Sequence, residues 1–260
     1  MGEAETLTDW ALVKKMTLWD YEELIEKISD VFSYSFVQQR YDHNMREAIG
    51  YARKLFGYDP KYAKRISRIA KTLKTLNGLK VANYTDLVHN VENKKKCEDF
   101  LRRTPLSFQD LIFLLNYIFR WVLPHKLYLS ELIDTENERV KDYAERLRLR
   151  GTRFNLDILE HGRTSEDREK LVKNTKIPRP FIFNLVNLAD MSRLPFSNRK
   201  TVRHLLAGGY GSMTKLAQTD SEIVEDMRLY FEWIGIRLSG FIDLKGIARW
   251  AKTVPIVLED

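Results

Sequence analysis

The sequence predicts an all-α protein made of tandem helical-hairpin units behind an N-terminal helical cap. Three observations predict this fold. Apolar residues recur at the 3.6-residue spacing of amphipathic helices, an order of helices closed by glycine occurs three times, and the only short β-like run is at 255–258. Hydrophobic residues make up 44% of the 260 residues, so the chain can bury a sizeable core.

The first sixty residues predict the helical cap. A first helix can begin after Thr8 or Asp9, and a second, capped near Asp20, runs toward Val37. A third helix is expected over 43–56. This section carries 7 Lys and Arg against 11 Asp and Glu, so it is acidic.

The clearest helix spans about 62–76, with Pro60 near its first turn and Gly78 as its expected stop. One side of this helix is apolar: Tyr62, Ala63, Ile66, Ile69, Ala70, Leu73 and Leu76. The other side is basic: Lys61, Lys64, Arg65, Arg68 and Lys71. Five cations on one helical face with no acid between them indicate a surface that attracts anions.

From this helix onward the chain repeats an order of elements. Each unit reads as a helix, a glycine turn, a short capped helix, a longer helix, a kink and a last helix. The turns are at Gly78, Gly151 and Gly209, and the kinks at Leu106, Ile177 and Ile236. The expected caps are Thr85, Asn155, and Ser212 or Thr214. An irregular helical bundle with similar caps is the alternative interpretation.

These patterns divide the chain into four segments. We expect an N-terminal cap over 1–60, a first unit over 61–135, a second over 136–195 and a third over 196–260. A charged helical stretch over 134–151 connects the first unit to the second.

Charge is unevenly distributed along the chain. The net charge of +7 and the pI near 9.3 favour a polyanionic partner. Residues 61–103 carry 12 Lys and Arg against 4 acids, and residues 181–215 carry 5 against 1. Residues 216–260 are acidic, with 5 against 8. Local excesses of this kind attract phosphate more than a uniform charge does.

Composition also indicates the cellular compartment of the protein. The one cysteine, Cys97, excludes an internal disulfide and fits a reducing interior. The longest apolar stretch, Leu111–Leu123, is too short to span a bilayer, and no secretory signal opens the sequence. We therefore expect a cytoplasmic protein without a membrane partner. Scarce glutamine and 30% charged residues indicate a thermophilic source.

The segment from Leu194 to Ser212 predicts a hairpin, a short helix and a glycine stop. Pro195 ends the preceding helix, and Ser197 is suited to cap the next. Arg199, Lys200 and Arg203 crowd the start of that helix. Free backbone amides and cations at a helix N-terminus together suit a phosphate.

The same segment resembles a helix-hairpin-helix module. The matching residues are Leu194, Pro195, Lys200, Leu205, Leu206, Gly209, Leu216 and Ala217. More closely, residues from about 80 to 255 resemble an uncharacterised archaeal family with a C-terminal domain of this kind and no assigned reaction. In the usual module, two hairpin glycines let backbone amides approach a DNA phosphate. Phe196 and Asn198 occupy those positions here, which weakens the implied phosphate clamp but not the implied fold.

Together these features predict a non-catalytic protein that binds nucleic acid, most simply DNA, through its phosphate backbone and without reading sequence. The expected binding residues are Lys61, Lys64, Arg65, Arg68, Lys71, Ser197, Asn198, Arg199, Lys200 and Arg203. We expect the two groups to converge on one basic ridge. Three alternatives stay open for the basic helix: it can face the acidic first section of the same chain, an acidic protein partner, or solvent alone. A protein-interaction scaffold without nucleic acid is the alternative function.

A third hypothesis is catalytic. The hairpin is similar to that of base-excision glycosylases, in which the lysine matching Lys200 attacks the sugar after base flipping. Those enzymes need an aspartate about eighteen residues later, where this chain has Gln218, and Asp220 reads more simply as a helix cap. The five scattered histidines predict no metal site, and no glycine-rich fingerprint predicts a nucleotide cofactor.

Overall fold

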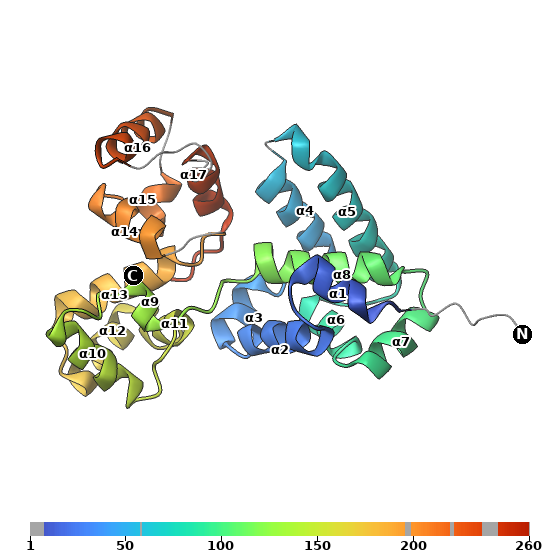
Figure 1. Cartoon of the computed structure of the whole chain (residues 1–260), viewed down its shortest axis with the longest axis horizontal. Helices are drawn as coiled ribbons and strands as arrows, with labels where there is room; N and C mark the ends of the chain where they lie inside the picture. The colour runs from blue at the N-terminus through green and yellow to red at the C-terminus, as the bar shows by residue number, and fades with distance from the viewer. Residues whose placement is uncertain (1–7, 58, 196–198, 219–220, 236–243, 260) are drawn as a thin grey trace, which may run out of the picture. The chain divides into compact units, whose positions relative to one another are not determined.

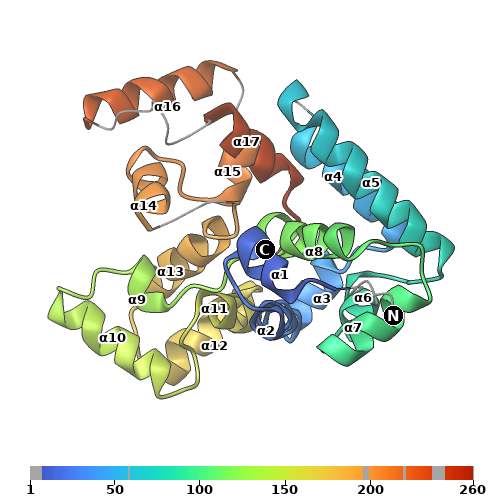
Figure 2. The same cartoon turned by 45° about the vertical axis from the view of Figure 1, so that its right-hand side comes forward.

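A computed structural model describes residues 8–57, 59–195, 199–218, 221–235 and 244–259. Within these residues the regular structure is helical, and β pairing is confined to two isolated bridges, Asn44 with Asn83 and Tyr128 with Phe154. The all-α prediction is confirmed (Figures 1 and 2). The chain forms two compact units, Met1–Leu123 and Pro124–Asp260. From here on these are the first and the second unit, and the predicted repeating segments are called repeats.

The first unit, Met1–Leu123, contains the predicted cap and most of the first predicted repeat, whose residues 124–135 lie in the second unit. Its helices are α1 (Trp10–Thr17), α2 (Tyr21–Phe32), α3 (Ser35–Tyr41), α4 (Met45–Phe56), the 3₁₀-helix η1 (Pro60–Tyr62), α5 (Ala63–Gly78), α6 (Tyr84–Asn90), α7 (Lys94–Arg102), α8 (Phe108–Tyr117) and the π-helical turn η2 (Ile118–Val122). Figures 1 and 2 show α4 and α5 side by side as a helical hairpin, and α8 packs against α5 and α1.

Short polar side chains set where these helices begin. Asp9 accepts hydrogen bonds from the amides of Ala11 and Leu12, as predicted for the first cap. The single helix expected from Asp20 to Val37 is wrong, because the chain breaks into α2 and α3 at Ser33 and Tyr34. There the Ser33 hydroxyl donates to the Asp30 carbonyl at 2.6 Å, which satisfies a carbonyl at the end of α2.

The core of this unit is rich in aromatic residues. Tyr21, Phe36, Tyr41, Phe56 and Tyr84 come from the four helices α2, α3, α4 and α6 and are almost completely buried. Burial of such large rings stabilises a helical unit of this size more than any surface interaction can. Because every helix contributes to one core, the acidic first section and the basic helix α5 fold as parts of the same unit.

The second unit, Pro124–Asp260, contains the second and third predicted repeats. Its helices are α9 (Leu129–Leu132), α10 (Glu138–Arg148), α11 (Asn155–Gly162), α12 (Ser165–Thr175), α13 (Arg179–Met191), α14 (Arg199–Ala207), α15 (Met213–Ala217), α16 (Ser221–Trp233) and α17 (Leu244–Thr253). Helix α11 packs against α12 and α13, and α17 packs against α15 and α16. The β-like run at 255–258 lies in an irregular segment.

Buried polar side chains tie the irregular segments of this unit to its helices. Asn155 is fully buried; its amide nitrogen donates to the His125 carbonyl and to the Ser192 hydroxyl, each at 2.8 Å. Its side-chain oxygen accepts from the amide of Leu127 at 2.8 Å. Asn155 was expected to cap its helix, but Phe154 occupies the N-cap position. A buried amide with three partners holds the segment before α9 against α11 and α13.

One local turn occurs three times, between the first and second helix of each predicted repeat. A residue with positive φ follows the helix: Lys80 at 62°, Gly151 at 80° and Gly209 at 88°. The next amide then bonds a carbonyl five residues earlier, from Val81 to Leu76, Thr152 to Leu147 and Tyr210 to Leu205, at 2.9–3.1 Å. All three leucines are fully buried. This is the Schellman closure, in which a left-handed residue lets the last carbonyls find partners.

The expected stops at Gly151 and Gly209 are confirmed by these φ angles. Helix α5 also ends at Gly78, as expected, but the left-handed residue is Lys80, two residues later. Among the short helices that follow, Ser212 caps α15 through the amide of Lys215, whereas Asn83, not Thr85, caps α6. The division of the chain into four segments stays a prediction.

In the described part of the chain, no helix combines the length and the apolar character that crossing a bilayer requires.

Candidate nucleic-acid interface

The predicted basic side of α5 is present, and its outermost members are exposed. Lys64 and Lys71 lie on the solvent side of the helix, opposite the buried Ile69 and Leu73. Lys61 lies just before α5, in η1, where its Nζ is 2.6 Å from an Asp59 oxygen. Both partners of this pair are on the surface, so the pair adds little to stability and competes only weakly with another anion.

Arg65 is placed differently from its neighbours, over a cluster of aromatic rings. Its guanidinium carbon lies 5.7 Å from the ring centres of Phe56 and Tyr62 and 5.5 Å from that of Trp121. Phe56 and Trp121 are themselves in edge-to-face contact at 4.5 Å. Arg65 therefore joins α4, α5 and η2 through cation–π contacts, and much of its surface is unavailable to a ligand.

Arg68 is engaged by an acid from a distant part of the sequence. Its Nε donates to the Asp110 carboxylate at 2.7 Å and its Nη2 to the Gln109 carbonyl at 3.2 Å, while the guanidinium lies 4.2 Å from the Phe113 ring centre. Partial burial acts to raise the pKa of Asp110, but hydrogen bonds from Arg68 and Ser107 outweigh it and lower that pKa. Asp110 is thus ionised at neutral pH and neutralises Arg68.

The α4–α5 hairpin also carries exposed cations from residues 1–60, the section that is acidic as a whole. Arg53 and Lys54 are exposed near the end of α4, and Lys74 is exposed on α5. Within the described residues Arg53, Lys54, Lys64, Lys71 and Lys74 make neither ion pairs nor side-chain hydrogen bonds. Their signal was present in the composition, since residues 45–78 hold nine Lys and Arg against two acids.

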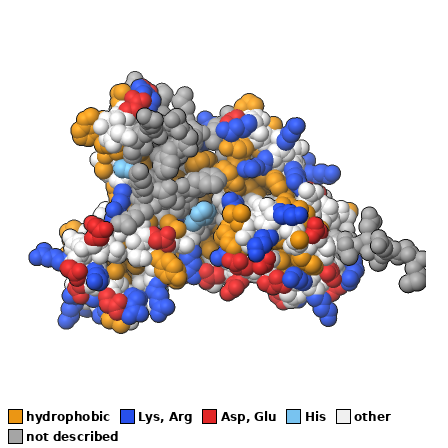
Figure 3. All heavy atoms as spheres, viewed as in Figure 1, with side chains coloured by type: hydrophobic (Ala, Val, Ile, Leu, Met, Phe, Trp, Pro, Cys, Tyr) orange, Lys and Arg blue, Asp and Glu red, His pale blue; other side chains and the backbone are white. Residues whose placement is uncertain are grey.

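Charge is therefore segregated within the first unit. We call the exposed cations Arg53, Lys54, Lys61, Lys64, Lys71 and Lys74 the hairpin face. The acids of α2, by contrast, are Glu22, Glu23, Glu26 and Asp30. Figure 3 shows Lys and Arg side chains over α4 and α5 and Asp and Glu side chains around α2. Pairing within the chain, the alternative left open above, occurs at Lys61 with Asp59 and at Lys94 with Glu22.

The second predicted group lies in the second unit. Ser197 and Asn198 lie outside the described residues, and Arg199 and Lys200 begin α14 with only their backbone described. Arg203 is half-buried and lines a cavity of about 190 Å³ with Asp134 and apolar side chains of α9, α10, α13 and α14. Because this group and the hairpin face belong to different units, their convergence on one ridge stays a prediction.

The cysteine is placed where it has little reactivity. Cys97 is fully buried on the inner side of α7, and burial raises the pKa of its thiol to about 11. A thiol with this pKa is protonated at neutral pH and is a poor nucleophile. Elsewhere in the described ranges, no three His, Cys, Asp or Glu side chains gather closely enough to hold a metal ion.

Comparison with known proteins identifies one region of the chain. No curated protein and no solved structure matches the chain. Residues 138–252 match the model of a family described as "Domain of unknown function (DUF4332)". The match runs from the start of α10 into α17, so it covers two of the three Schellman turns and leaves the hairpin face outside. This part of the second unit is therefore similar to the DUF4332 family.

Proposed function

We propose that the protein binds the phosphate backbone of nucleic acid, without catalysis and without reading sequence, through the hairpin face. The observation that carries this proposal is the set of exposed cations on α4 and α5 that have no acidic partner among the described residues. Such cations are fully hydrated and can release counterions from a nucleic-acid backbone on contact. DNA is the simplest ligand for a surface of this kind.

The hairpin supports the proposal by its rigidity as well as its charge. Helices α4 and α5 pack along their length through Ala52, Leu55, Ile69 and Leu73, all of them fully buried. Lysines carried by such a hairpin keep a fixed spacing along its surface, as a regular array of phosphates requires. The half-buried ring of Tyr62 lies among these cations, with Lys61 Nζ at 4.9 Å and the Arg65 guanidinium at 5.7 Å from its centre.

We further propose that residues 194–220 form the helix-hairpin-helix-like module that their sequence resembles. Support comes from α14, the Schellman turn at Gly209 and the Ser212 cap of α15, which follow one another in the expected order. In this proposal Arg199 and Lys200 add backbone contacts to those of the hairpin face.

The test is a titration of the full-length protein with duplex and single-stranded DNA at several salt concentrations. We expect affinity to fall steeply with salt, as it does when several phosphates are neutralised. The triple variant Lys64→Ala/Lys71→Ala/Lys74→Ala is expected to bind at least about tenfold more weakly at low salt, with a log–log salt slope smaller by about 2–3. All three side chains are exposed, so the fold is expected to persist.

A control with the same change in net charge is Lys15→Ala/Arg139→Ala/Lys173→Ala, which removes exposed cations of α1, α10 and α12. It is expected to bind like the unmodified protein. A second arm, Asp110→Asn, removes the acid that holds Arg68 and is expected to strengthen binding. Equal losses in the two triple variants would refute the hairpin face, and no binding at low salt would favour the protein-interaction scaffold.

A further inference from the structure

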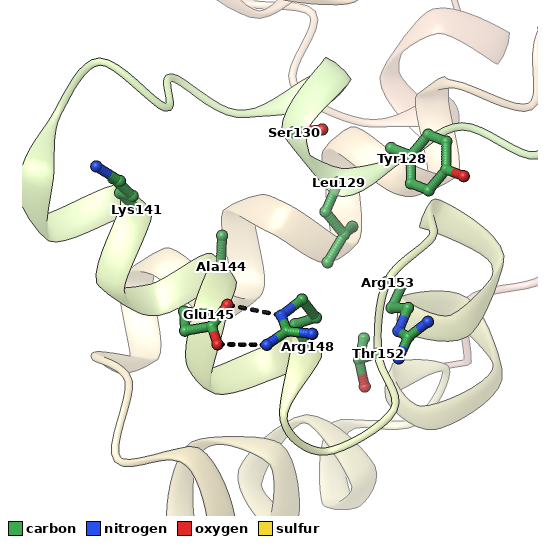
Figure 4. Close-up of a pocket in the computed structure, with 9 residues that line it drawn as sticks. All are labelled: Tyr128, Leu129, Ser130, Lys141, Ala144, Glu145, Arg148, Thr152 and Arg153. Atoms are coloured by element: carbon green, nitrogen blue, oxygen red, sulfur yellow. Dashed lines mark hydrogen bonds and ion pairs between the residues drawn. The ribbon is translucent and has the colours of Figure 1, made fainter.

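A cavity of about 560 Å³ opens in the second unit beside α9, α10 and the Schellman turn between α10 and α11 (Figure 4). Its volume is within the range of sites for small molecules. In Figure 4, Tyr128 and Arg153 lie on one side of the cavity and Lys141 on the other, with Glu145 and Arg148 below them. The cavity is separate from the hairpin face, which belongs to the first unit.

The lining of this cavity carries an excess of positive charge. The lining holds Lys141, Arg148, Arg153 and one acid, Glu145, while Lys141 Nζ also lies 3.7 Å from Glu138, outside the lining. Arg148 donates two hydrogen bonds to Glu145, from Nε at 2.7 Å and from Nη2 at 2.6 Å. The guanidinium of Arg153 makes neither an ion pair nor a hydrogen bond within the described part of the chain. A cavity with these groups favours an anionic ligand.

An aromatic ring borders the same cavity. The side chain of Tyr128 is 57% exposed, and its ring centre lies 4.7 Å from that of Phe154. The isolated β-bridge between the two residues and the bond from the Tyr128 amide to Glu131 hold this ring in place. An exposed ring that is held from behind provides a stacking surface for a flat ligand.

A threonine lies between this cavity and its neighbour. Thr152 is 2% exposed and lines both this cavity and an adjoining one of about 340 Å³. Its amide closes the Schellman turn, whereas its hydroxyl has no hydrogen-bond partner among the residues that the structure describes. The hydroxyl can therefore donate a hydrogen bond to an acceptor that a ligand places in either cavity.

We propose that this cavity binds a nucleoside phosphate. Its flat base stacks on Tyr128, and its phosphate is held by Arg153 on the same side of the cavity, with a hydrogen bond from the Thr152 hydroxyl. Glu145 limits the affinity, since it occupies the Arg148 donors that a phosphate would otherwise use in bidentate fashion. The ligand can be a free nucleotide or the terminal nucleotide of a strand, because both present the same groups.

The experiment is a calorimetric titration of the full-length protein with adenosine monophosphate. We expect a dissociation constant below about 1 mM, with adenosine and inorganic phosphate each at least about tenfold weaker, because each supplies one half of the interaction. A 5′-phosphorylated oligonucleotide, tested on the variant that lacks Lys64, Lys71 and Lys74, distinguishes a strand end from a free nucleotide. Failure of the hairpin face to bind DNA would leave these results unaffected.

Three variants test the assignment of residues. Arg153→Ala is expected to weaken binding of the monophosphate about tenfold, and Thr152→Val, which keeps the shape of the side chain, severalfold. Glu145→Gln is expected to strengthen binding severalfold because it releases Arg148, a gain that misfolding cannot produce. Arg139→Ala, an exposed cation of α10 outside the cavity lining, is the matched control and is expected to have no effect.

The proposal is overturned if the monophosphate does not bind at about 5 mM, well above the expected dissociation constant. It is also overturned if Arg153→Ala binds as the unmodified protein does. Phosphate binding as tightly as the monophosphate would remove the role of Tyr128 and with it the assignment to a nucleoside.

Discussion

At the scale of single residues, the most consequential polar side chain of the second unit is Arg193. Its side chain is fully buried, its Nε donates to Asp190 at 2.9 Å, and its Nη1 donates to the Pro255 carbonyl at 2.9 Å. It thereby connects the end of α13 to the segment that follows α17. Nothing in the local sequence marks Arg193 as buried, because its acceptor at 255 is 62 residues away.

We expect Arg193→Met to lower the free energy of unfolding by about 3–5 kcal/mol, because the Asp190 carboxylate stays buried without its partner. Urea unfolding followed by circular dichroism measures this change. The matched control is Arg179→Met, which removes an exposed arginine paired with Glu169 and is expected to cost little. Equal costs for the two variants would contradict the structural role of Arg193.

The local sequence likewise does not show which basic residues of α5 have partners in the folded protein. The spacing of Lys64 and Lys71 predicted their exposure correctly, since it follows from helical geometry alone. Arg65 and Arg68 have the same spacing and charge, yet they contact Trp121 and Asp110. Those partners are more than forty residues away, so local spacing cannot show which of these cations have a partner.

At the scale of elements, the recurring feature is the Schellman turn. The backbone at Lys80, Gly151 and Gly209 has the same left-handed conformation, although only two of the three residues are glycine. Glycine adopts this conformation without cost, whereas a side chain makes it unfavourable by about 1–2 kcal/mol. The first turn is therefore strained at Lys80.

This difference predicts opposite effects at equivalent positions. We expect Lys80→Gly to raise the free energy of unfolding by up to about 1 kcal/mol and Gly151→Ala to lower it by about 1 kcal/mol. A Cβ at 151 would have no heavy atom within 4 Å, so the loss there comes from the backbone alone. Urea unfolding of both variants checks this, and destabilisation by Lys80→Gly would refute the strain.

The repeat also shows how sequence spacing locates an element without fixing its ends. A helix, a turn and a short helix were expected at all three places and are present. The first stop was put at Gly78, because glycine is the usual left-handed residue. The turn is instead two residues later, where the buried Leu76 and the closing amide of Val81 require a left-handed Lys80.

At the scale of the whole molecule, the chain forms two units that meet in sequence between Leu123 and Pro124. Each has a core of its own: Phe36, Phe56 and Tyr84 in the first, and Ile158 and Leu185 in the second. We expect fragments 1–123 and 124–260 each to be helical and to unfold cooperatively on heating, as measured by circular dichroism. A fragment without a cooperative transition would contradict the division.

The division also separates the two proposed activities. The hairpin face belongs to residues 1–123, and the nucleoside-phosphate cavity belongs to residues 124–260, mostly within the part that is similar to the DUF4332 family. Binding of DNA and binding of a mononucleotide can therefore be measured, and can fail, independently of each other.

The sequence by itself determined the all-α fold, the amphipathic α5, and a helix, a turn and a short helix at each of three places, because helical periodicity and helix ends depend on a few residues. The tertiary structure decided which charges stay available. Asp110 neutralises Arg68, α4 brings Arg53 and Lys54 into the hairpin face, and Tyr128 comes to border a cavity with Lys141 and Arg153. These outcomes depend on contacts between distant segments, and helical spacing carries no information about them.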